Sequence, residues 1–242
     1  MKNKKKLKEK RVVVVTGGNG TIGKAIINKF KSEGAKCFAI DIKGSYPVLK
    51  CDLLNEKELK KTFNKISSKN KITDVIHAAG TVVIGEIKNS TTEEFDENIN
   101  NNLKTAFLVG KTCSSKIKRG GSLTFISSQA GLKGAKYWGI YCLSKAAILR
   151  LSETLANELA HKKIRVNAVC PGDVEGPMMK NAIKKLSRFS NKTEKSIYNN
   201  YLNNILMKRF AKPSEIADTC FYFSNSKFVT GTIALVDGGE NA

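Results

Sequence analysis

The feature that most constrains the fold is a repeated alternation of short β-branched runs with stretches of helical periodicity. Val12 to Val15 is an unbroken aliphatic run that stops at a glycine turn, and residues 20–32 then carry apolar side chains at helical spacing. This alternation predicts parallel strands joined by right-handed crossovers. Because the strands are almost continuously apolar, we expect helices on both faces of the sheet. The sequence therefore predicts a single α/β domain built on a doubly wound parallel sheet.

The alternation continues to the end of the chain. It predicts strands at residues 12–15, 36–40, 46–50, 73–77, 122–127, 164–169 and 233–236. It predicts helices at residues 20–32, 55–67, 91–116, 138–160 and 213–224, with Thr91 and Glu94 spaced as a capping box. A long polar region, residues 173–207, falls outside the pattern, and we expect it to form a flap at the carboxyl edge of the sheet. The chain thus divides into a basic N-terminal tail, residues 1–10, and one folded domain, residues 11–242.

The chain is strongly basic, with 42 Lys and Arg against 21 Asp and Glu. The lysines are spread among acidic residues, and the only dense block runs from Lys2 to Arg11. Such a terminal run is typical of a solvated tail, so we expect no specific nucleic-acid partner; weak attraction to nucleic acid or an anionic membrane stays open. The longest aliphatic run, Val12 to Val15, is far shorter than the roughly 20 residues of a membrane span, and no signal-peptide cleavage site follows it.

The six cysteines and two histidines argue against a metal centre and against a disulfide framework. No two cysteines have the C-x-x-C spacing, and several lie within apolar segments, as small buried hydrophobes in a reducing compartment do. We therefore expect no metal, and the cytoplasm is the default location.

A glycine-rich turn, Thr16 to Gly23, directly follows the first predicted strand and opens the first predicted helix. In this setting glycines let the backbone approach a pyrophosphate, and the helix N-terminus offers free N–H groups and a positive dipole end. Similar turns also occur without a ligand, so the turn by itself is a moderate signal. The residues predicted here to contact a dinucleotide are Gly17, Asn19, Gly20, Thr21, Ile22 and Gly23.

Asp41 ends the second predicted strand, 18 residues after Gly23. A carboxylate at this position can accept both ribose hydroxyls of an adenosine and would repel a 2′-phosphate. It therefore favours NAD over NADP as the cofactor. Lys43 lies close by and could neutralise a 2′-phosphate, so NADP stays open as the less favoured alternative.

Tyr141 and Lys145 lie four residues apart in a predicted helix and share one face. An ammonium within about 5 Å is expected to lower the pKa of a phenol by about 1–3 pH units, which makes the phenolate a usable general base for an alcohol. An isolated pair of this kind is most often an ordinary surface pair. Here, however, Ser127 and Ser128 end a predicted strand at the same edge, where a hydroxyl can hydrogen-bond a substrate oxygen.

With these motifs in view, the sequence resembles the classical short-chain dehydrogenases/reductases over nearly its whole length, from Val12 to Gly239. The stretches similar to that family's motifs are Thr16–Gly23, Asp52-Leu53, His77-Ala78-Ala79-Gly80, Asn102, Ser128, Tyr141, Lys145, Pro171-Gly172 and Val236-Asp237-Gly238-Gly239. The resemblance implies a Rossmann-like fold and a dinucleotide-binding catalytic domain, because the catalytic positions and the cofactor turn agree in order and spacing.

The resemblance also implies a role for each catalytic position. Tyr141 would exchange a proton with the substrate oxygen, and Lys145 would lower the pKa of that phenol and bind the nicotinamide ribose. Ser128 would orient and polarise the carbonyl or hydroxyl group, and Asn102 would hold a water that links Lys145 to solvent. Cofactor contacts besides those of the glycine turn, Asp41, Tyr141 and Lys145 are implied at Asp52, Leu53, Ala79, Gly80, Pro171, Gly172 and Val174.

The sequence departs from the family pattern at three places. Thr21 stands where a glycine is usual, although Gly20 precedes it. His77 and Ala78 replace two asparagines, and we interpret His77 as structural. Gly176 stands near the position of a threonine that contacts the cofactor in many members, which puts that contact in doubt.

The resulting hypothesis is an NAD(P)-dependent oxidoreductase that transfers a hydride between a nicotinamide cofactor and a secondary alcohol or ketone. A sugar or polyol derivative and a 3-oxoacyl thioester are both open as the small-molecule substrate. Basic residues in the region 173–207 suggest an anionic substrate, but their excess over the chain average is too small to decide. A non-catalytic dinucleotide-binding sensor on the same fold is the alternative function. The resemblance further implies a homo-oligomer, a tetramer or a dimer, built from the two long helices and the last strand.

Overall fold

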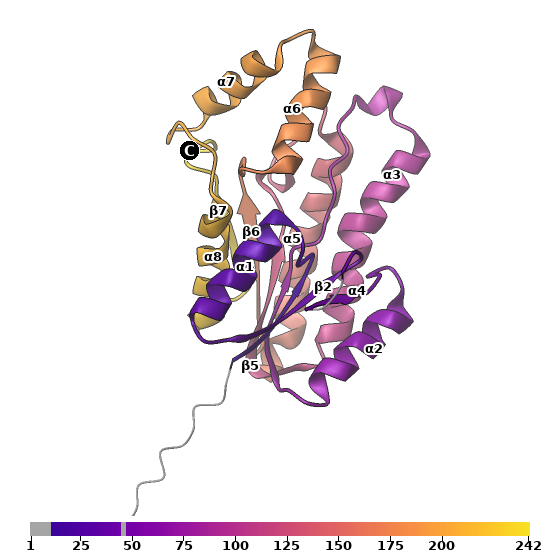
Figure 1. Ribbon diagram of the computed structural model, residues 1–242, viewed down its shortest axis with the longest axis vertical. Coiled ribbons are helices and arrows are strands. Elements are labelled where there is room, and N and C mark those ends of the chain that lie inside the picture. Colours follow the sequence, from indigo (N-terminus) through magenta and orange to yellow (C-terminus); the bar gives the residue numbers. More distant parts are fainter. Residues whose placement is uncertain (1–10, 45–46) are drawn as a thin grey trace, which may run out of the picture.

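The computed structural model describes residues 11–44 and 47–242, and these form one seven-stranded parallel sheet between two layers of helices (Figure 1). The strands pair in the order β3-β2-β1-β4-β5-β6-β7. Their bounds are β1 Val12–Thr16, β2 Lys36–Asp41, β3 Val48–Lys50, β4 Ile72–His77, β5 Ile117–Ile126, β6 Arg165–Pro171 and β7 Ile233–Val236. The predicted doubly wound α/β fold is confirmed, and the predicted N-terminal tail, residues 1–10, lies outside the described residues.

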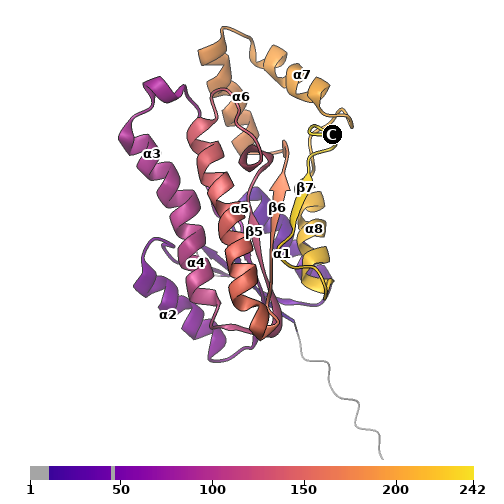
Figure 2. The same ribbon diagram turned by 180° about the vertical axis from the view of Figure 1, so that it is seen from behind.

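Successive residues of the central strands supply two separate cores. Val14 of β1 packs in the cluster that α2 Glu56–Ser67, α4 Thr105–Cys113 and α5 Gly139–Leu159 cover. Its neighbours Val13 and Val15 pack instead against α1 Thr21–Ser32 and α8 Pro213–Asn225. Figures 1 and 2 show these two helix groups on opposite sides of the sheet. The continuous apolar run is thus explained by a strand buried on both faces.

The strand order reverses beside β1, which places the turn after β1 next to the turn after β4. Thr16 and His77, the last residues of these strands, are register partners. In an open parallel sheet such a switch point leaves a crevice at the carboxyl ends, where ligands bind. The glycine turn and the segment that begins at Ala78 both lead away from this point.

The predicted helix at 91–116 is an almost continuous helix with an irregular centre. The α-helix α3 Thr92–Ile99 passes into a π-helical turn, η2 Asn100–Lys104, and then into α4. The predicted capping box is present, because Glu94 N donates to Thr91 Oγ1 and Thr91 N donates to Glu94 Oε2, each at 3.1 Å. A π turn within a helix is frequently found at a functional site.

Two predicted strands differ in length from the observed ones. The strand β5 begins at Ile117, five residues before the predicted start at residue 122. The polar and glycine-rich stretch 118–121 looks like a turn in the sequence, and the pairing of β4 with β5 shifts register there. The strand β3 begins at Val48, and residues 45 and 46 lie outside the described residues.

The polar region 173–207 contains two helices that the sequence analysis did not assign, α6 Pro177–Ser190 and α7 Glu194–Asn204. Four buried side chains at helical spacing hold α6 in place: Met179, Ala182, Ile183 and Leu186. They form a small apolar cluster that includes Ile197 of α7. The high polar content of this region hides the apolar stripe, which is why its helical character is easy to miss.

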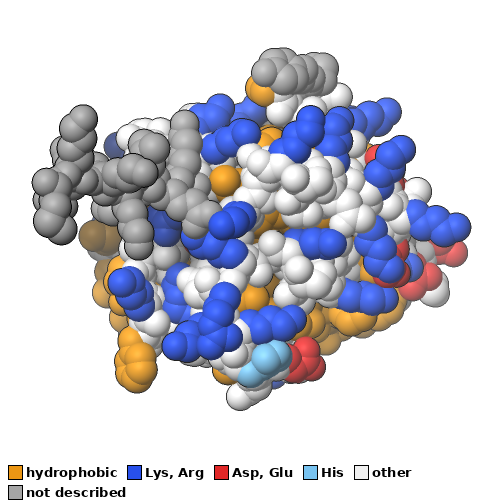
Figure 3. Space-filling view, turned by 90° about the horizontal axis from the view of Figure 1, so that it is seen from below, with side chains coloured by type: hydrophobic (Ala, Val, Ile, Leu, Met, Phe, Trp, Pro, Cys, Tyr) orange, Lys and Arg blue, Asp and Glu red, His pale blue; other side chains and the backbone are white. Residues whose placement is uncertain are grey.

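The surface of the molecule is rich in basic side chains. Figure 3 views the end of the molecule opposite α6 and α7 and shows Lys and Arg spread over most of the visible face. Within the part of the chain that the structure describes, no helix combines the length and apolarity needed to cross a bilayer.

Candidate active site

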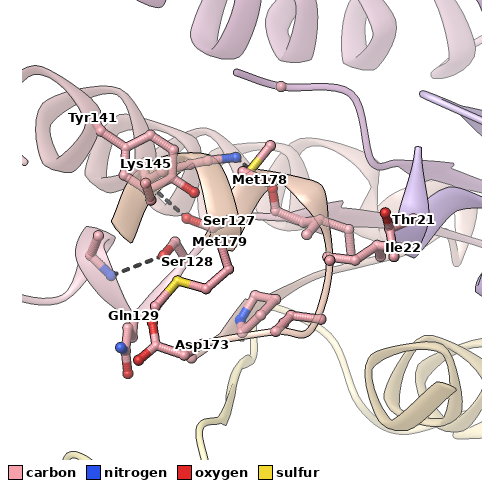
Figure 4. Close-up of a pocket in the computed structure, with 18 of the residues that line it drawn as sticks. Thr21, Ile22, Ser127, Ser128, Gln129, Tyr141, Lys145, Asp173, Met178 and Met179 are labelled. Carbon is pink, nitrogen blue, oxygen red and sulfur yellow. Dashed lines mark hydrogen bonds between the residues drawn. The ribbon is translucent and has the colours of Figure 1, made fainter. Parts of the chain in front are cut away.

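A cavity of about 300 Å³ opens at the carboxyl ends of the strands. Its walls come from the glycine turn, the segments after β4, β5 and β6, the start of α5, both helices of the region 173–207, and the C-terminal segment. Figure 4 shows Thr21 and Ile22 at one side of this cavity, with Ser128 and Tyr141 at the other. The segments far apart in the sequence that carry the predicted motifs therefore converge on one site.

The glycine turn has the shape of an anion cradle. Gly20 N donates to Gly17 O at 3.1 Å, which closes the turn, and Gly20 caps α1 without any side-chain hydrogen bond. The first turn of α1 carries no acidic residue. A Cβ on Gly23 would lie 2.1 Å from Gly17 O, so the tight turn requires glycine there. The backbone N–H groups of the first turn of α1 are left free for a ligand, and they fit the pyrophosphate of a dinucleotide.

Asp41 contacts the glycine turn from the end of β2. Its Oδ2 accepts a hydrogen bond from Asn19 N at 3.0 Å, and its Oδ1 accepts one from Lys43 N at 3.3 Å. The Asn19 side chain also donates to Lys43 O. The carboxylate thus stands at the end of β2 directly against the glycine turn, which is where a ribose-binding carboxylate is needed.

Five of the predicted cofactor contacts lie outside the walls of the cavity. Asp52 Oδ1 accepts from Leu54 N at 2.9 Å, and Leu53 is buried in the core beneath the sheet. Gly17, Asn19 and Asp41 do not line the cavity either. The predicted contacts that do line the cavity are Gly20, Thr21, Ile22, Gly23, Ala79, Gly80, Tyr141, Lys145, Pro171, Gly172 and Val174.

Gly80 brings the loop after β4 against Asn102 and Lys145. A Cβ on this glycine would lie 2.8 Å from Asn102 Oδ1 and 3.4 Å from Lys145 Nζ. A contact under 3.0 Å forces a displacement, so even alanine would disturb Asn102. The glycine therefore permits the close approach of three segments: the loop after β4, the π turn and α5.

Asn102 lies in the π turn, fully buried, and its side-chain amide is saturated. Its Oδ1 accepts from Thr81 N at 2.8 Å. Its Nδ2, which carries two hydrogens, has three acceptors within hydrogen-bond distance: Thr81 O at 3.0 Å, Asn98 Oδ1 at 3.1 Å and Ser144 Oγ at 3.0 Å. The amide therefore ties the loop after β4 to α5, and its hydrogen bonds are directed to these partners rather than to Lys145.

Lys145 is buried, and its amine reaches the floor of the cavity. Its Nζ donates to Ile126 O at 3.1 Å, and Ser127 Oγ donates to Lys145 O at 2.8 Å. Burial lowers the pKa of the Lys145 amine to about 8, because the charged form loses its hydration. The end of β5 thus fixes both the backbone and the amine of this residue.

Tyr141 lies one helical turn before Lys145, and its ring centroid is 5.6 Å from Lys145 Nζ. Burial raises the pKa of the Tyr141 phenol to about 12, while a hydrogen bond with Ser128 opposes that rise. The expectation that the ammonium lowers the pKa of Tyr141 is wrong for this state, because the loss of hydration outweighs the favourable interactions. The phenol is therefore protonated at neutral pH.

Ser128 follows β5 in an extended conformation and lies in the cavity wall. Its Oγ accepts from Ala130 N at 3.1 Å, which opens the short turn that follows. That bond holds the hydroxyl oxygen beside Tyr141, as Figure 4 shows. The serine, the tyrosine and the lysine predicted from sequence are thus brought together at one point of the cavity.

The turn after β6 forms the opposite wall. Gly172 N donates to Val236 O at 2.9 Å, and a Cβ on Gly172 would lie 2.8 Å from the backbone of Asp237. Thr21, the departure in the glycine turn, faces Gly176: its Cγ2 and Oγ1 each lie 3.3 Å from the position of a Cβ there. Threonine at 21 and glycine at 176 therefore fit together sterically.

His77 lies in the sheet rather than in the cavity wall. Its side chain is fully buried, and its Nδ1 is 2.8 Å from Thr16 Oγ1. Its Nε2 has no hydrogen-bond partner among the described residues. Burial lowers the pKa of His77 to about 3, with a further lowering by Lys145, so the ring is neutral at physiological pH.

The structure adds cavity residues that the sequence analysis did not assign a role. They include Asp173, Met178, Met179, Ala182, Tyr201 and Glu240. Tyr201 and Glu240 belong to segments that meet the cavity only through the tertiary fold, so no local pattern marks them. The six basic residues of the region 173–207 are exposed, and none is part of the cavity wall: Lys180, Lys184, Lys185, Arg188, Lys192 and Lys195.

Comparison with known proteins agrees with this site. A family model described as enoyl-(acyl carrier protein) reductase matches residues 18–241. The human 3-oxoacyl-[acyl-carrier-protein] reductase is 29% identical, over 95% of this chain and 97% of its own. The ligand-free aldohexose dehydrogenase of Thermoplasma acidophilum matches with a TM-score of 0.87 at 28% identity, over 96% of this chain and 94% of that one.

A short-chain dehydrogenase family protein of Francisella tularensis matches with a TM-score of 0.87 at 27% identity, over 96% of this chain and 98% of that one. The cavity, the glycine turn and these matches identify a nicotinamide-dependent oxidoreductase that acts on CH–OH and C=O groups. The chain belongs to the short-chain dehydrogenase/reductase family.

Proposed function

We propose that Tyr141, Ser128 and Lys145 are the residues with which this oxidoreductase interconverts a secondary alcohol and its ketone. The observation that supports this assignment is the convergence of a phenol, a hydroxyl and a buried amine on one cavity beside the glycine turn. A nicotinamide bound in the cavity would supply the hydride chemistry. The residues that would hold the dinucleotide are those of the glycine turn, Asp41, Ala79 and Gly80, Pro171 and Gly172, and Lys145.

The three groups divide the work according to their ionisation. Because the Tyr141 phenol is protonated, it is ready to donate its proton to a ketone oxygen as negative charge develops there. Ser128 donates a hydrogen bond to the same oxygen. The Lys145 ammonium stabilises the phenolate that forms. Asn102 acts as a positioning residue, because its amide holds the loop after β4 against α5.

NAD is the proposed cofactor, with NADP the alternative. Asp41 already lies against the glycine turn, where a carboxylate would accept ribose hydroxyls and repel a 2′-phosphate. No basic residue lies between Gly17 and Gly23 to neutralise a 2′-phosphate. The substrate is proposed to be a sugar or polyol derivative, as for the aldohexose dehydrogenase, or a 3-oxoacyl thioester, as for the human reductase.

The wider setting of the enzyme is also a proposal. The region 173–207 would act as a flap, since Met178, Met179 and Tyr201 lie in the cavity wall. All six cysteines are free thiols, which supports a cytoplasmic location. Exposed Phe107 and Leu143 on α4 and α5 support assembly into a homodimer or homotetramer through these helices.

A spectrophotometric panel tests the proposed function. Secondary alcohols are offered with NAD and ketones with NADH, and both series are repeated with the phosphorylated cofactors. We expect turnover, with kcat/KM higher for the unphosphorylated cofactor. A tenfold preference for NADP would contradict the role of Asp41. Binding of NADH without oxidation by any carbonyl compound would contradict catalysis and support the sensor alternative.

A further inference from the structure

The far end of the cavity is acidic although the protein is strongly basic. Five charged residues line the cavity, and three of them are acidic: Asp173, Glu175 and Glu240. The chain as a whole carries 21 acidic residues against 42 Lys and Arg. The two lysines in the lining are Lys145, which belongs to the proposed catalytic group, and Lys133, whose side chain is exposed. Figure 4 shows Gln129 and Asp173 at the side of the cavity away from Thr21 and Ile22.

Glu240 is held in place by the fold of the C-terminal segment. Asp237 accepts hydrogen bonds from Gly239 N at 3.0 Å and from Asn241 N at 2.9 Å, which bends the chain back toward the cavity. Gln129 Nε2 donates to Glu240 Oε2 at 2.8 Å, and Gln129 Oε1 accepts from Asn241 Nδ2 at 2.8 Å. Ser128, Gln129 and Glu240 all line the cavity, so this pair holds the Glu240 carboxylate in the same cavity as the Ser128 hydroxyl.

Asp173 provides the second carboxyl group, directly after the Pro171-Gly172 turn. Its Oδ2 is buried and has no hydrogen-bond partner among the described residues. Burial raises the pKa of Asp173 to about 7, and the charge of Glu240 raises it further. A buried carboxyl oxygen without a donor is unfavourable, so a ligand that brings a donor to this group gains the interaction that the protein lacks.

We propose that Asp173 and Glu240, with Gln129 and Tyr201, form a subsite that binds the hydroxyl groups of a polyhydroxylated substrate. The inference rests on the proposed function and selects between its two substrate classes: the substrate is a neutral polyol or sugar rather than an acyl thioester or a phosphorylated compound. The reacting CH–OH group lies at Ser128 and Tyr141, and a neighbouring hydroxyl group donates to the carboxyl groups of the subsite.

The chemistry of the subsite argues against the other classes of substrate. An acyl chain would cover two carboxyl groups without giving either a hydrogen bond, and a phosphate would be repelled by both. The lysines that suggested an anionic substrate are exposed and outside the cavity wall. An ammonium ion can only donate hydrogen bonds, whereas a hydroxyl group both donates and accepts, which suits a carboxyl group that is partly protonated near neutral pH.

Two charge-removing substitutions test the subsite. The variants Asp173→Asn and Glu240→Gln are compared with the wild type on NAD-dependent oxidation of xylitol and sorbitol, of 2-butanol, and of 3-hydroxybutyrate. We expect each variant to lower kcat/KM for the polyols at least tenfold and to raise kcat/KM for 3-hydroxybutyrate. We expect kcat/KM for 2-butanol to stay within about twofold of the wild-type value. The matched control is Glu175→Gln, which removes an exposed acidic group of the same cavity wall and should leave the polyol rates unchanged.

Several results would overturn the subsite. One is an equal loss of kcat/KM for all substrates in both variants. Another is a higher wild-type kcat/KM for 3-hydroxybutyrate or its thioesters than for the polyols. A third is a higher kcat/KM for 2-amino-1,3-propanediol than for glycerol. The quenching of NADH fluorescence by xylitol provides a readout without turnover. Binding that is lost in Asp173→Asn while no alcohol is oxidised would contradict the proposed function and keep the subsite. Absence of polyol binding together with turnover of 2-butanol would contradict the subsite alone.

Discussion

At the scale of single residues, burial sets the resting charges of the site. It raises the pKa of Tyr141 to about 12 and lowers the pKa of Lys145 to about 8. Both shifts favour the neutral form of the group. The site therefore holds a protonated phenol as a proton donor, and the proximity of the amine to the ring becomes important when the phenol gives up its proton. This is the state that carbonyl reduction requires.

A pH experiment tests the state of Asp173. Its folded pKa is about 7 and the unfolded value is near 3.8, so the folded protein binds the extra proton between these values. The stability that protonated Asp173 contributes is present below about pH 3.8 and is lost as the pH rises through 7. We expect the unfolding free energy of the wild type, relative to Asp173→Asn, to fall by at most about 4 kcal/mol between pH 4 and pH 7. Urea titrations of both proteins measure it, and a difference that rises with pH would contradict the assignment.

The variant Gly80→Ala tests the close approach at the end of β4. The new methyl group would lie 2.8 Å from Asn102 Oδ1, so the Asn102 amide must move, and it would touch Lys145 Nζ at 3.4 Å. We expect kcat/KM to fall at least tenfold, with a lower melting temperature. Gly134→Ala is the control, because a Cβ there meets no atom within 4 Å. Equal activity of the two variants would show that this approach does not matter.

At the scale of elements, the π turn between α3 and α4 connects the segments that form the site. It places the Asn102 amide where it can bond Thr81 in the loop after β4 and Ser144 in α5 at once. The extra residue in the turn breaks the regular helical repeat, which turns this side chain inward between the two segments. The loop that holds Gly80 and the helix that holds Lys145 are thereby fixed relative to each other.

Replacing Asn102 with alanine should remove the contacts that hold the loop after β4 against α5. The partly buried hydrogen bond from Thr81 N would be lost, which costs about 0.5–1.5 kcal/mol of stability. Because Asn102 positions Lys145 rather than touching the substrate, we expect kcat to fall more than KM rises, and we expect the alkaline limb of the pH–rate profile to shift. The control is Asn101→Ala, the neighbouring residue of the same turn. A loss of stability with an unchanged pH profile would reduce Asn102 to a structural role.

The helices, strands and turns differ in how well the local sequence predicts them. The strand at 12–16 and the capping box at Thr91 are local patterns, so the sequence predicts them well. The convergence of Ser128, Tyr141 and Lys145 is predicted by the end of a strand at Ser128 together with the family resemblance, because a Tyr–Lys pair at helical spacing does not predict it alone. The π turn, the helices α6 and α7, and the approach of Glu240 to Gln129 depend on contacts between distant segments, which no local pattern contains. The pKa of Tyr141 was misjudged because burial cannot be read from a helical spacing.

At the scale of the whole molecule, the basic surface and the acidic cavity end serve different purposes. The excess of Lys and Arg keeps the protein strongly positive on the outside (Figure 3). Glu240 acts on the charge of Asp173, and Figure 4 shows Asp173 away from Thr21 and Ile22. The third acidic residue of the cavity wall, Glu175, instead precedes Gly176, which faces Thr21. The cradle for an anionic dinucleotide and the proposed polyol subsite of Asp173 and Glu240 therefore occupy separate ends. The sheet supports this separation, because the glycine turn follows β1 whereas Asp173 follows β6.

The outer face of α4 and α5 makes a prediction about assembly. Phe107 on α4 is 48% exposed and Leu143 on α5 is 56% exposed. The exposure of these large apolar side chains to water is unfavourable, and a second copy of the chain would remove it. We expect light scattering to give the mass of a dimer or tetramer for the wild type and a smaller species for Phe107→Lys. Ile42→Lys, at an exposed apolar residue of a different face, is the control. A monomeric wild type at 10 µM would contradict this interface.

The central claim is that the Tyr141 hydroxyl group transfers the proton that accompanies hydride transfer. The most direct measurement compares the wild type with Tyr141→Phe in single-turnover ketone reduction and in NADH binding by fluorescence. General acid catalysis contributes roughly a hundredfold to ten-thousandfold, so the account predicts a loss of that size in the rate of reduction. It also predicts that the NADH dissociation constant changes by less than about threefold. A variant that reduces ketones within tenfold of the wild-type rate would contradict the claim.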